Sequence, residues 1–134
     1  MRTRGFEELE VYQLSEKLAD SIWDMVRGWP VFAKDTVGKQ MVRAADSIGA
    51  NIAEGSGRGT YQDNRRFVRI ARGSLLETRH FLRRAFRRHL LSSEEIAIVL
   101  PMIKELAPRL NAYLRSIGPT NENASDDEQM TNDK

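Results

Sequence analysis

The fold is decided by one stretch of the sequence, residues 40–54, which reads Gln-Met-Val-Arg-Ala-Ala-Asp-Ser-Ile-Gly-Ala-Asn-Ile-Ala-Glu. Its apolar residues recur at three- and four-residue steps, which place them on one side of a helix at about 100° per residue. We therefore predict an amphipathic helix from about Thr36, with Asp35 as its N-cap, to Glu54. The glycine-rich run Gly55-Ser56-Gly57-Arg58-Gly59 ends it.

Residues 8–28, before this stretch, show the same helical period. Gly28 and the pair Trp29-Pro30 end that helix, because the residue before a proline is forced out of the α region. The side chains predicted to face inward are Val11, Leu14, Leu18, Ile22, Met25, Val26 and Trp29.

Two more helices are predicted after the glycine-rich run, at residues 60–89 and 92–117. Each begins with a hydroxyl residue followed three positions later by an acid, the spacing of a capping box: Thr60 with Asp63, and Ser92 with Glu95. Pro101 and Pro108 lie inside the last helix, where we expect a bend. The predicted inner face of residues 60–89 consists of Phe67, Ile70, Ala71, Ser74, Leu75, Thr78, Phe81, Leu82 and Ala85.

Four amphipathic helices joined by short links bury their apolar sides by packing antiparallel. The predicted fold is therefore all-α, an up-down-up-down four-helix bundle over residues 1–118. Residues 119–134 hold five acidic residues and one lysine, so this tail carries a charge of −4. The bundle carries +6, and the two together give the net charge of +2. Because the tail has almost no large apolar side chain, we expect it to be disordered. It is either a solubilising extension or a nucleic-acid mimic that competes for the basic bundle.

The composition excludes several classes of protein. The chain has no cysteine, so disulfide scaffolds, thiolate chemistry and cysteine-based zinc sites are excluded. No apolar run approaches the roughly 18 residues of a membrane span, and we expect a cytoplasmic protein with no membrane partner.

The sequence carries no signature of an enzyme. Glu77 and His80 form one Glu-x-x-His pair, whereas a di-iron bundle needs two such pairs and two further glutamates. The glycines at 55, 57 and 59 follow no strand and precede no Lys-Ser/Thr pair, so they do not form a phosphate loop. We expect no catalytic residue, no metal and no cofactor.

A polar stripe adjoins the apolar side of the second helix. Asparagine and serine at its middle positions are poor helix formers, which favours a hydrogen-bonded network at a subunit interface. A solvated face fits the same spacing. The stripe consists of Gln40, Arg43, Ser47, Asn51, Glu54 and Arg58.

Arginine is concentrated between residues 58 and 88, where the sequence has ten arginines and only two acidic residues. On a helical wheel six of them fall on one arc, which we predict lies opposite the apolar side. Like charges four residues apart repel without a partner, and the planar guanidinium suits phosphate. We therefore predict binding of RNA or DNA; the alternatives are an acidic protein partner and a solvated or internally paired face. The six are Arg65, Arg69, Arg72, Arg79, Arg83 and Arg87.

Residues 40–58 and 67–77, together with the opening at residues 6–13, resemble a bacterial family of four-helix bundles. That family was first noticed as open reading frames in intervening sequences of the large ribosomal RNA gene. The most specific part is Asn51-Ile52-Ala53-Glu54-Gly55-x-Gly57-Arg58. The resemblance covers about residues 6–117 and leaves out the acidic tail.

The resemblance implies a homo-oligomeric ring, typically a pentamer, without enzymatic activity. It also implies kinship with the accessory variability protein of diversity-generating retroelements, which engages nucleic acid and a reverse transcriptase. The family pattern adds Ser74 and Glu77 to the stripe as interface or structural residues. The leading hypothesis is thus a non-enzymatic accessory or scaffold protein that binds RNA or DNA; the alternative is a protein-interaction module with no nucleic-acid role.

Overall fold

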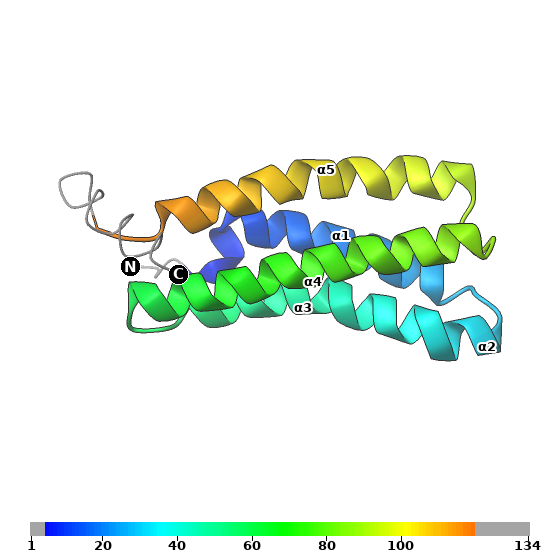
Figure 1. Cartoon of the computed structure of the whole chain (residues 1–134), viewed down its shortest axis with the longest axis horizontal. Helices are drawn as coiled ribbons and strands as arrows, with labels where there is room; N and C mark the ends of the chain where they lie inside the picture. Colours follow the sequence, from blue (N-terminus) through cyan, green and yellow to red (C-terminus); the bar gives the residue numbers. More distant parts are fainter. Residues whose placement is uncertain (1–4, 120–134) are drawn as a thin grey trace.

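The computed structural model describes residues 5–119, and the part described is all-α. Four long helices lie antiparallel, connected by short turns (Figure 1). No strand occurs between residues 5 and 119. In chain order the elements are η1 (Phe6–Glu8), α1 (Glu10–Val26), α2 (Val31–Ala33), the π-helical turn η2 (Lys34–Gly38), α3 (Lys39–Ser56), α4 (Tyr61–Arg87) and α5 (Ser93–Ser116).

The four long helices follow one another around the bundle in the order α1, α3, α4 and α5. Helix α3 packs against α1 and α4, while α5 packs against the other sides of α1 and α4. Figure 1 shows α4 in front of α1, with α5 along the upper edge and α3 along the lower edge. This arrangement confirms the predicted antiparallel bundle; the predicted tail falls, apart from Pro119, outside the described residues.

A continuous apolar core runs along the bundle axis. The apolar sides of the four long helices supply it, and each large aliphatic side chain buried there contributes about 1.5 to 3 kcal/mol relative to full exposure. No helix in the described part is long and apolar enough to cross a bilayer. The largest completely buried apolar side chains are Leu18, Ile22, Met41, Ile48, Ile52, Val68, Val99, Leu106 and Leu110.

The predicted start of the second helix is wrong. Helical structure begins at Val31, directly after Pro30, rather than at Thr36, and Asp35 is not an N-cap. Proline's fixed φ and missing N–H suit the start of a helix. The π turn then brings Gly38 against α1, where an added Cβ would lie 2.7 Å from Val26 Cγ1 and 3.2 Å from Trp29 Cε3. A larger side chain would therefore not fit at Gly38 without displacing its neighbours.

The predicted starts of α4 and α5 are confirmed. The Asp63 N–H donates to Thr60 Oγ1 at 3.1 Å. Ser92 and Glu95 form the complete reciprocal capping box. Helix α5 continues through both internal prolines, as one curved ribbon in Figure 1. Both prolines lie on the exposed side, where water can solvate the carbonyls left without donors.

Candidate nucleic-acid interface

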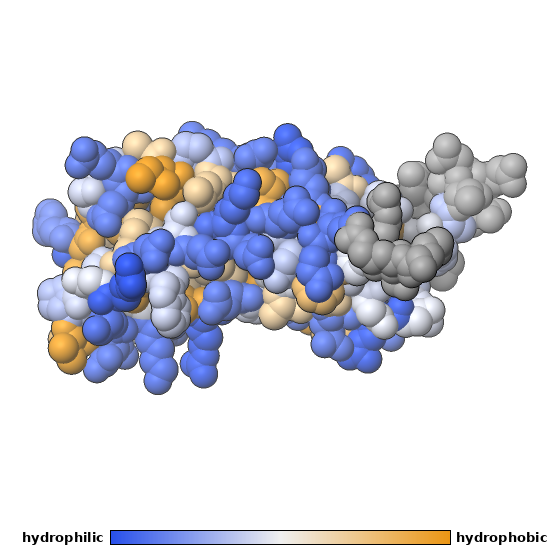
Figure 2. Space-filling view, turned by 180° about the vertical axis from the view of Figure 1, so that it is seen from behind, coloured by the Kyte–Doolittle hydropathy of each residue, from blue (hydrophilic) through white to orange (hydrophobic). Residues whose placement is uncertain are grey.

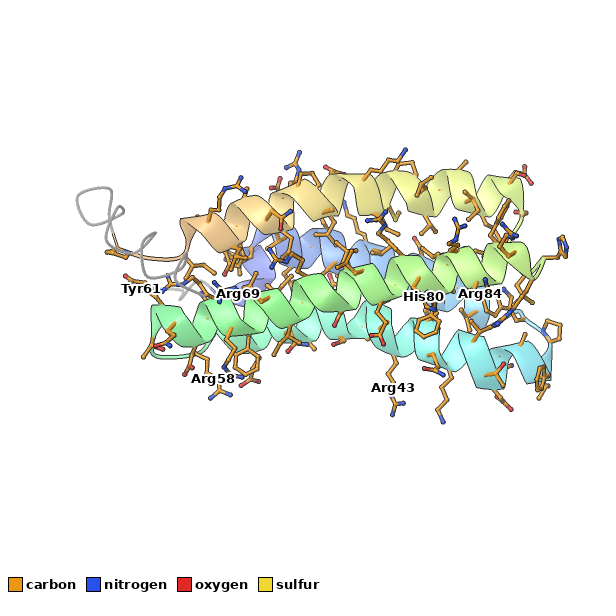
Figure 3. All side chains as sticks on the ribbon, viewed as in Figure 1. Arg43, Arg58, Tyr61, Arg69, His80 and Arg84 are labelled. Carbon is orange, nitrogen blue, oxygen red and sulfur yellow. The ribbon has the colours of Figure 1, made fainter. Side chains whose placement is uncertain are left out.

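Helix α4 carries the candidate site on the flank that faces α5. The Thr60 cap fixes its start, and its 27 residues span about 40 Å. We define the arginine row as Arg69, Arg72, Arg79, Arg83 and Arg87. All but Arg69 are largely exposed, and Arg69 is half-buried. Arg69 projects from the side of α4 that adjoins α5, away from Arg43 of α3 and Arg58 of the turn that follows α3 (Figure 3).

The predicted position of this row, directly opposite the core, is wrong. Arg72 Nη1 donates to Asn111 Oδ1 of α5 at 3.3 Å, and Arg79 and Arg83 line a groove shared with α5. The buried side of α4 is therefore turned from the predicted one: Val68 is fully buried, whereas Ile70 is 43% exposed. The buried side of α4 covers a wide part of the helix surface, because α4 packs against α3 on one side and against α5 on the other.

Arg65, the sixth predicted phosphate ligand, is not on the exposed surface. Its side chain is only 7% exposed, and Nη1 donates to the Ile117 carbonyl oxygen at 2.7 Å. Ile117 follows the last turn of α5, where carbonyl groups lack helical donors and the helix dipole is negative. Arg65 therefore ties the end of α5 to the start of α4.

The arginine row is not neutralised by neighbouring acids. Among residues 5–119, none of its five members forms an ion pair. Other arginines do pair: Arg58 with Glu54 at 3.1 Å, Arg66 with Asp63 at 3.9 Å, and Arg109 with both Glu10 and Glu105. The row's charge is therefore available to an external anion.

The sequence prediction missed apolar side chains on the same flank. Leu76 lies between Arg72 and Arg79 at helical spacing, and it is 57% exposed. Phe86 continues the flank beyond Arg83 and is 47% exposed. The spacing of Leu76 within the row gave a usable signal, because a leucine there interrupts a charged face. No such signal exists in the sequence for Phe86, because the exposure of its side chain depends on how α5 packs against α4.

The middle of the polar stripe forms a network within one chain. Asn51 Nδ2 donates to the Ser47 carbonyl oxygen at 2.8 Å and to Ser47 Oγ at 2.9 Å. Ser74 Oγ of α4 donates to Ser47 Oγ at 2.9 Å, and Thr78 Oγ1 donates to the Ser74 carbonyl oxygen. These residues therefore join α3 to α4. The remaining stripe residues are exposed: Gln40, Arg43, Glu54, Arg58 and Glu77.

The opposite side of the bundle, between α1 and α3, is acidic. Glu16, Asp20 and Asp46 line a depression there beside small residues of both helices. Burial raises the pKa of the Asp46 carboxyl, and the nearby Asp20 carboxylate raises it further. Basic and acidic surfaces thus lie on different sides of one bundle.

The described residues bring no metal-ligand set together. Within residues 5–119, no three histidine or acidic side chains are grouped so that they could hold a metal ion. His80 lies edge-to-face against Phe81, with ring centroids 5.1 Å apart. Glu77 is exposed.

Residues 7–112 match the family model described as 23S rRNA-intervening sequence protein. The chain belongs to this family. The match covers α1 to α4 and most of α5, so it includes both the arginine row and the polar stripe. No curated protein matches the chain.

Proposed function

We propose that this intervening-sequence protein is a non-enzymatic, oligomeric accessory or scaffold protein that binds RNA or DNA through the arginine row. The observation that carries the proposal is that five arginines share one flank of α4 without a carboxylate partner among the described residues. A reverse transcriptase or other protein partner is a part of the proposal that rests on the family resemblance, and cytoplasmic location is a part that rests on the sequence expectation given above.

The geometry of the row suits a phosphate backbone. Arg69 to Arg87 extend over about 27 Å at 1.5 Å per residue. At about 3.4 Å per nucleotide of one strand, this length matches roughly eight phosphates. Guanidinium groups bind phosphate in a bidentate fashion without reading bases, so binding should depend little on sequence.

Gel shifts at several salt concentrations test the proposal. We expect wild-type protein to shift both a duplex and a structured RNA, with log-log salt slopes of about −0.9 per phosphate neutralised on B-DNA. Replacing Arg79, Arg83 and Arg87 with glutamine should lower affinity and salt slope together, while glutamine preserves helix propensity.

The matched control removes the same charge elsewhere. Arg27→Gln, Arg43→Gln and Arg66→Gln lower the net charge equally but lie outside the row. Equal loss of binding in both triple variants would show that only net charge matters. Absence of any wild-type shift at about 0.15 M salt, where the Debye length is about 8 Å, would overturn the proposal in favour of an acidic protein partner.

A further inference from the structure

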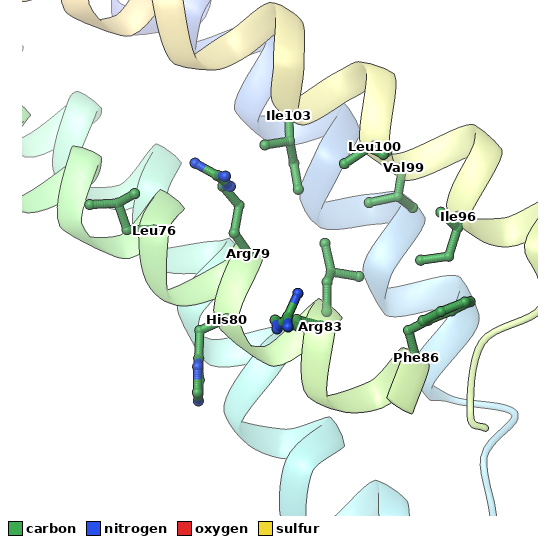
Figure 4. A pocket seen from close by; sticks show the side chains of 10 residues that line it. Leu76, Arg79, His80, Arg83, Phe86, Ile96, Val99, Leu100 and Ile103 are labelled. Carbon is green, nitrogen blue, oxygen red and sulfur yellow. The ribbon is translucent and has the colours of Figure 1, made fainter. Parts of the chain in front are cut away.

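A groove between the second half of α4 and the first half of α5 has no role in the proposed nucleic-acid contact apart from sharing Arg79 and Arg83. Its volume is about 530 Å³. Figure 4 shows Arg79 and Arg83 on the α4 side, Phe86 near the end of α4, and the apolar side chains of α5 across from them. The side chains contributed by α5 are Ile96, Val99, Leu100 and Ile103.

Three large apolar side chains on the walls of the groove are exposed. Leu76, Phe86 and Leu100 on its walls are between 41% and 57% exposed. Exposed apolar residues scattered singly need no explanation, but three gathered in one concave site are typical of a binding surface. Helices α4 and α5 also pack less extensively than α3 and α4, which leaves the groove open.

The lining selects the chemistry of the occupant. Apart from Phe86 and His80 the apolar walls are aliphatic, so most of the groove offers no stacking surface to a nucleic-acid base and suits leucine, isoleucine and phenylalanine side chains. Because the groove is open along one side, the occupant keeps a polar face in water. Arg79 and Arg83 line the groove, and none of the described residues that line it is acidic. Charge complementarity therefore requires an acidic occupant.

The dimensions fit a short helix. From Leu76 to Phe86 the α4 wall extends about 15 Å, which is the length of about ten helical residues. Helix-in-groove recognition uses apolar anchors at i, i+3, i+4 and i+7, and these fit within that length. We propose that this groove docks an acidic amphipathic helix of a partner protein, with its apolar face on the α4–α5 walls and its carboxylates on Arg79 and Arg83.

The test uses the full-length chain and a designed probe. The probe is a fluorescein-labelled, hydrocarbon-stapled peptide of about 14 residues, with leucines at i, i+3, i+4 and i+7 and glutamates beside them. Fluorescence anisotropy should show saturable binding. A scrambled peptide and a peptide with lysine in place of glutamate should bind at least roughly tenfold more weakly.

Two double variants with equal polarity changes locate the contact. Leu76→Gln/Leu100→Gln should weaken peptide binding by roughly tenfold or more and leave the nucleic-acid gel shift unchanged. Ile70→Gln/Ile98→Gln alters exposed apolar residues of the same helices outside the groove and should change neither. Failure of the groove proposal can therefore be distinguished from failure of the nucleic-acid proposal, because peptide binding tests the first and the gel shift tests the second.

Three results would overturn the groove proposal. The first is equal binding of the acidic, scrambled and lysine peptides. The second is equal peptide affinity in both double variants. The third is a fall in the light-scattering mass of Leu76→Gln/Leu100→Gln alone, because that would show a second copy of the chain in the groove.

Discussion

Arg65 and Arg66 are adjacent in the sequence but occupy opposite environments. Arg65 is buried and donates to the Ile117 carbonyl, whereas Arg66 is exposed and lies over the Phe67 ring, 4.6 Å from its centroid. Arg58 lies over the same ring at 4.7 Å. Arginine residues in this chain thus serve three physical roles: capping a helix end, stacking on an aromatic ring, and presenting charge.

At Arg65 we predict a large loss of stability on Arg65→Met. Methionine keeps an apolar stem of similar length but leaves the buried end of α5 without this charged donor. The expected loss is about 1.5 to 3 kcal/mol in the free energy of unfolding, measured by urea denaturation. Arg66→Met is the matched control and should remain within about 0.5 kcal/mol of wild type. Equal small effects would mean that the contact with Ile117 contributes nothing.

At the scale of the helices, the contact between α3 and α4 depends on Gly55. A Cβ added there would lie 2.6 Å from Asn64 Oδ1, 3.0 Å from Phe67 Cβ and 3.1 Å from the Asn64 carbonyl oxygen. The Asn64 carbonyl oxygen is a backbone atom and Phe67 Cβ is bonded directly to the backbone, so neither can move away by side-chain rotation. Gly73, in the middle of α4, has nothing within 4 Å of such a Cβ among the described residues.

Gly55→Ala and Gly73→Ala should therefore change stability in opposite directions. We expect Gly55→Ala to destabilise by about 1 to 3 kcal/mol, since the helices must separate. Gly73→Ala should stabilise by about 0.5 to 1 kcal/mol, because alanine has the higher helix propensity. Thermal unfolding of both variants checks the pair, and stabilisation by Gly55→Ala would contradict the close approach.

Local sequence patterns predicted the helices well and the orientation of α4 less well. The hydroxyl caps at Thr60 and Ser92 and the stop at Pro30 depend on neighbouring residues only, so they were predictable. The close approach of Gly38, in the π turn, to Val26 of α1 joins two elements, so no local pattern encodes it. Five of the six predicted arginines form the arginine row, but the row was misplaced on α4, because apolar Ile70 is exposed and charged Arg65 is buried.

At the scale of the whole molecule, α4 carries two different surfaces on its two flanks. Towards α3 it presents Ser74 and Glu77 with the polar stripe, and towards α5 it presents the arginine row. In the view of Figure 2 most of the surface is hydrophilic, while apolar residues gather toward the end at left, where α2 lies. There Val31 and Phe32 are exposed. Contact between copies through the stripe would leave the arginine row free for nucleic acid.

The last prediction is that the chain forms a closed ring, with five subunits favoured by the family resemblance. Light scattering at tens of micromolar should give a mass of about 77 kDa, five times the chain mass of 15.3 kDa. Arg43 lies on the exposed part of the stripe, so Arg43→Glu should lower that mass by placing a repulsive charge at the contact. Arg27→Glu makes the same charge change on α1's end and should leave the mass unaltered. A wild-type mass of a single chain would rule out the ring, and equal effects of both variants would remove the stripe from the interface.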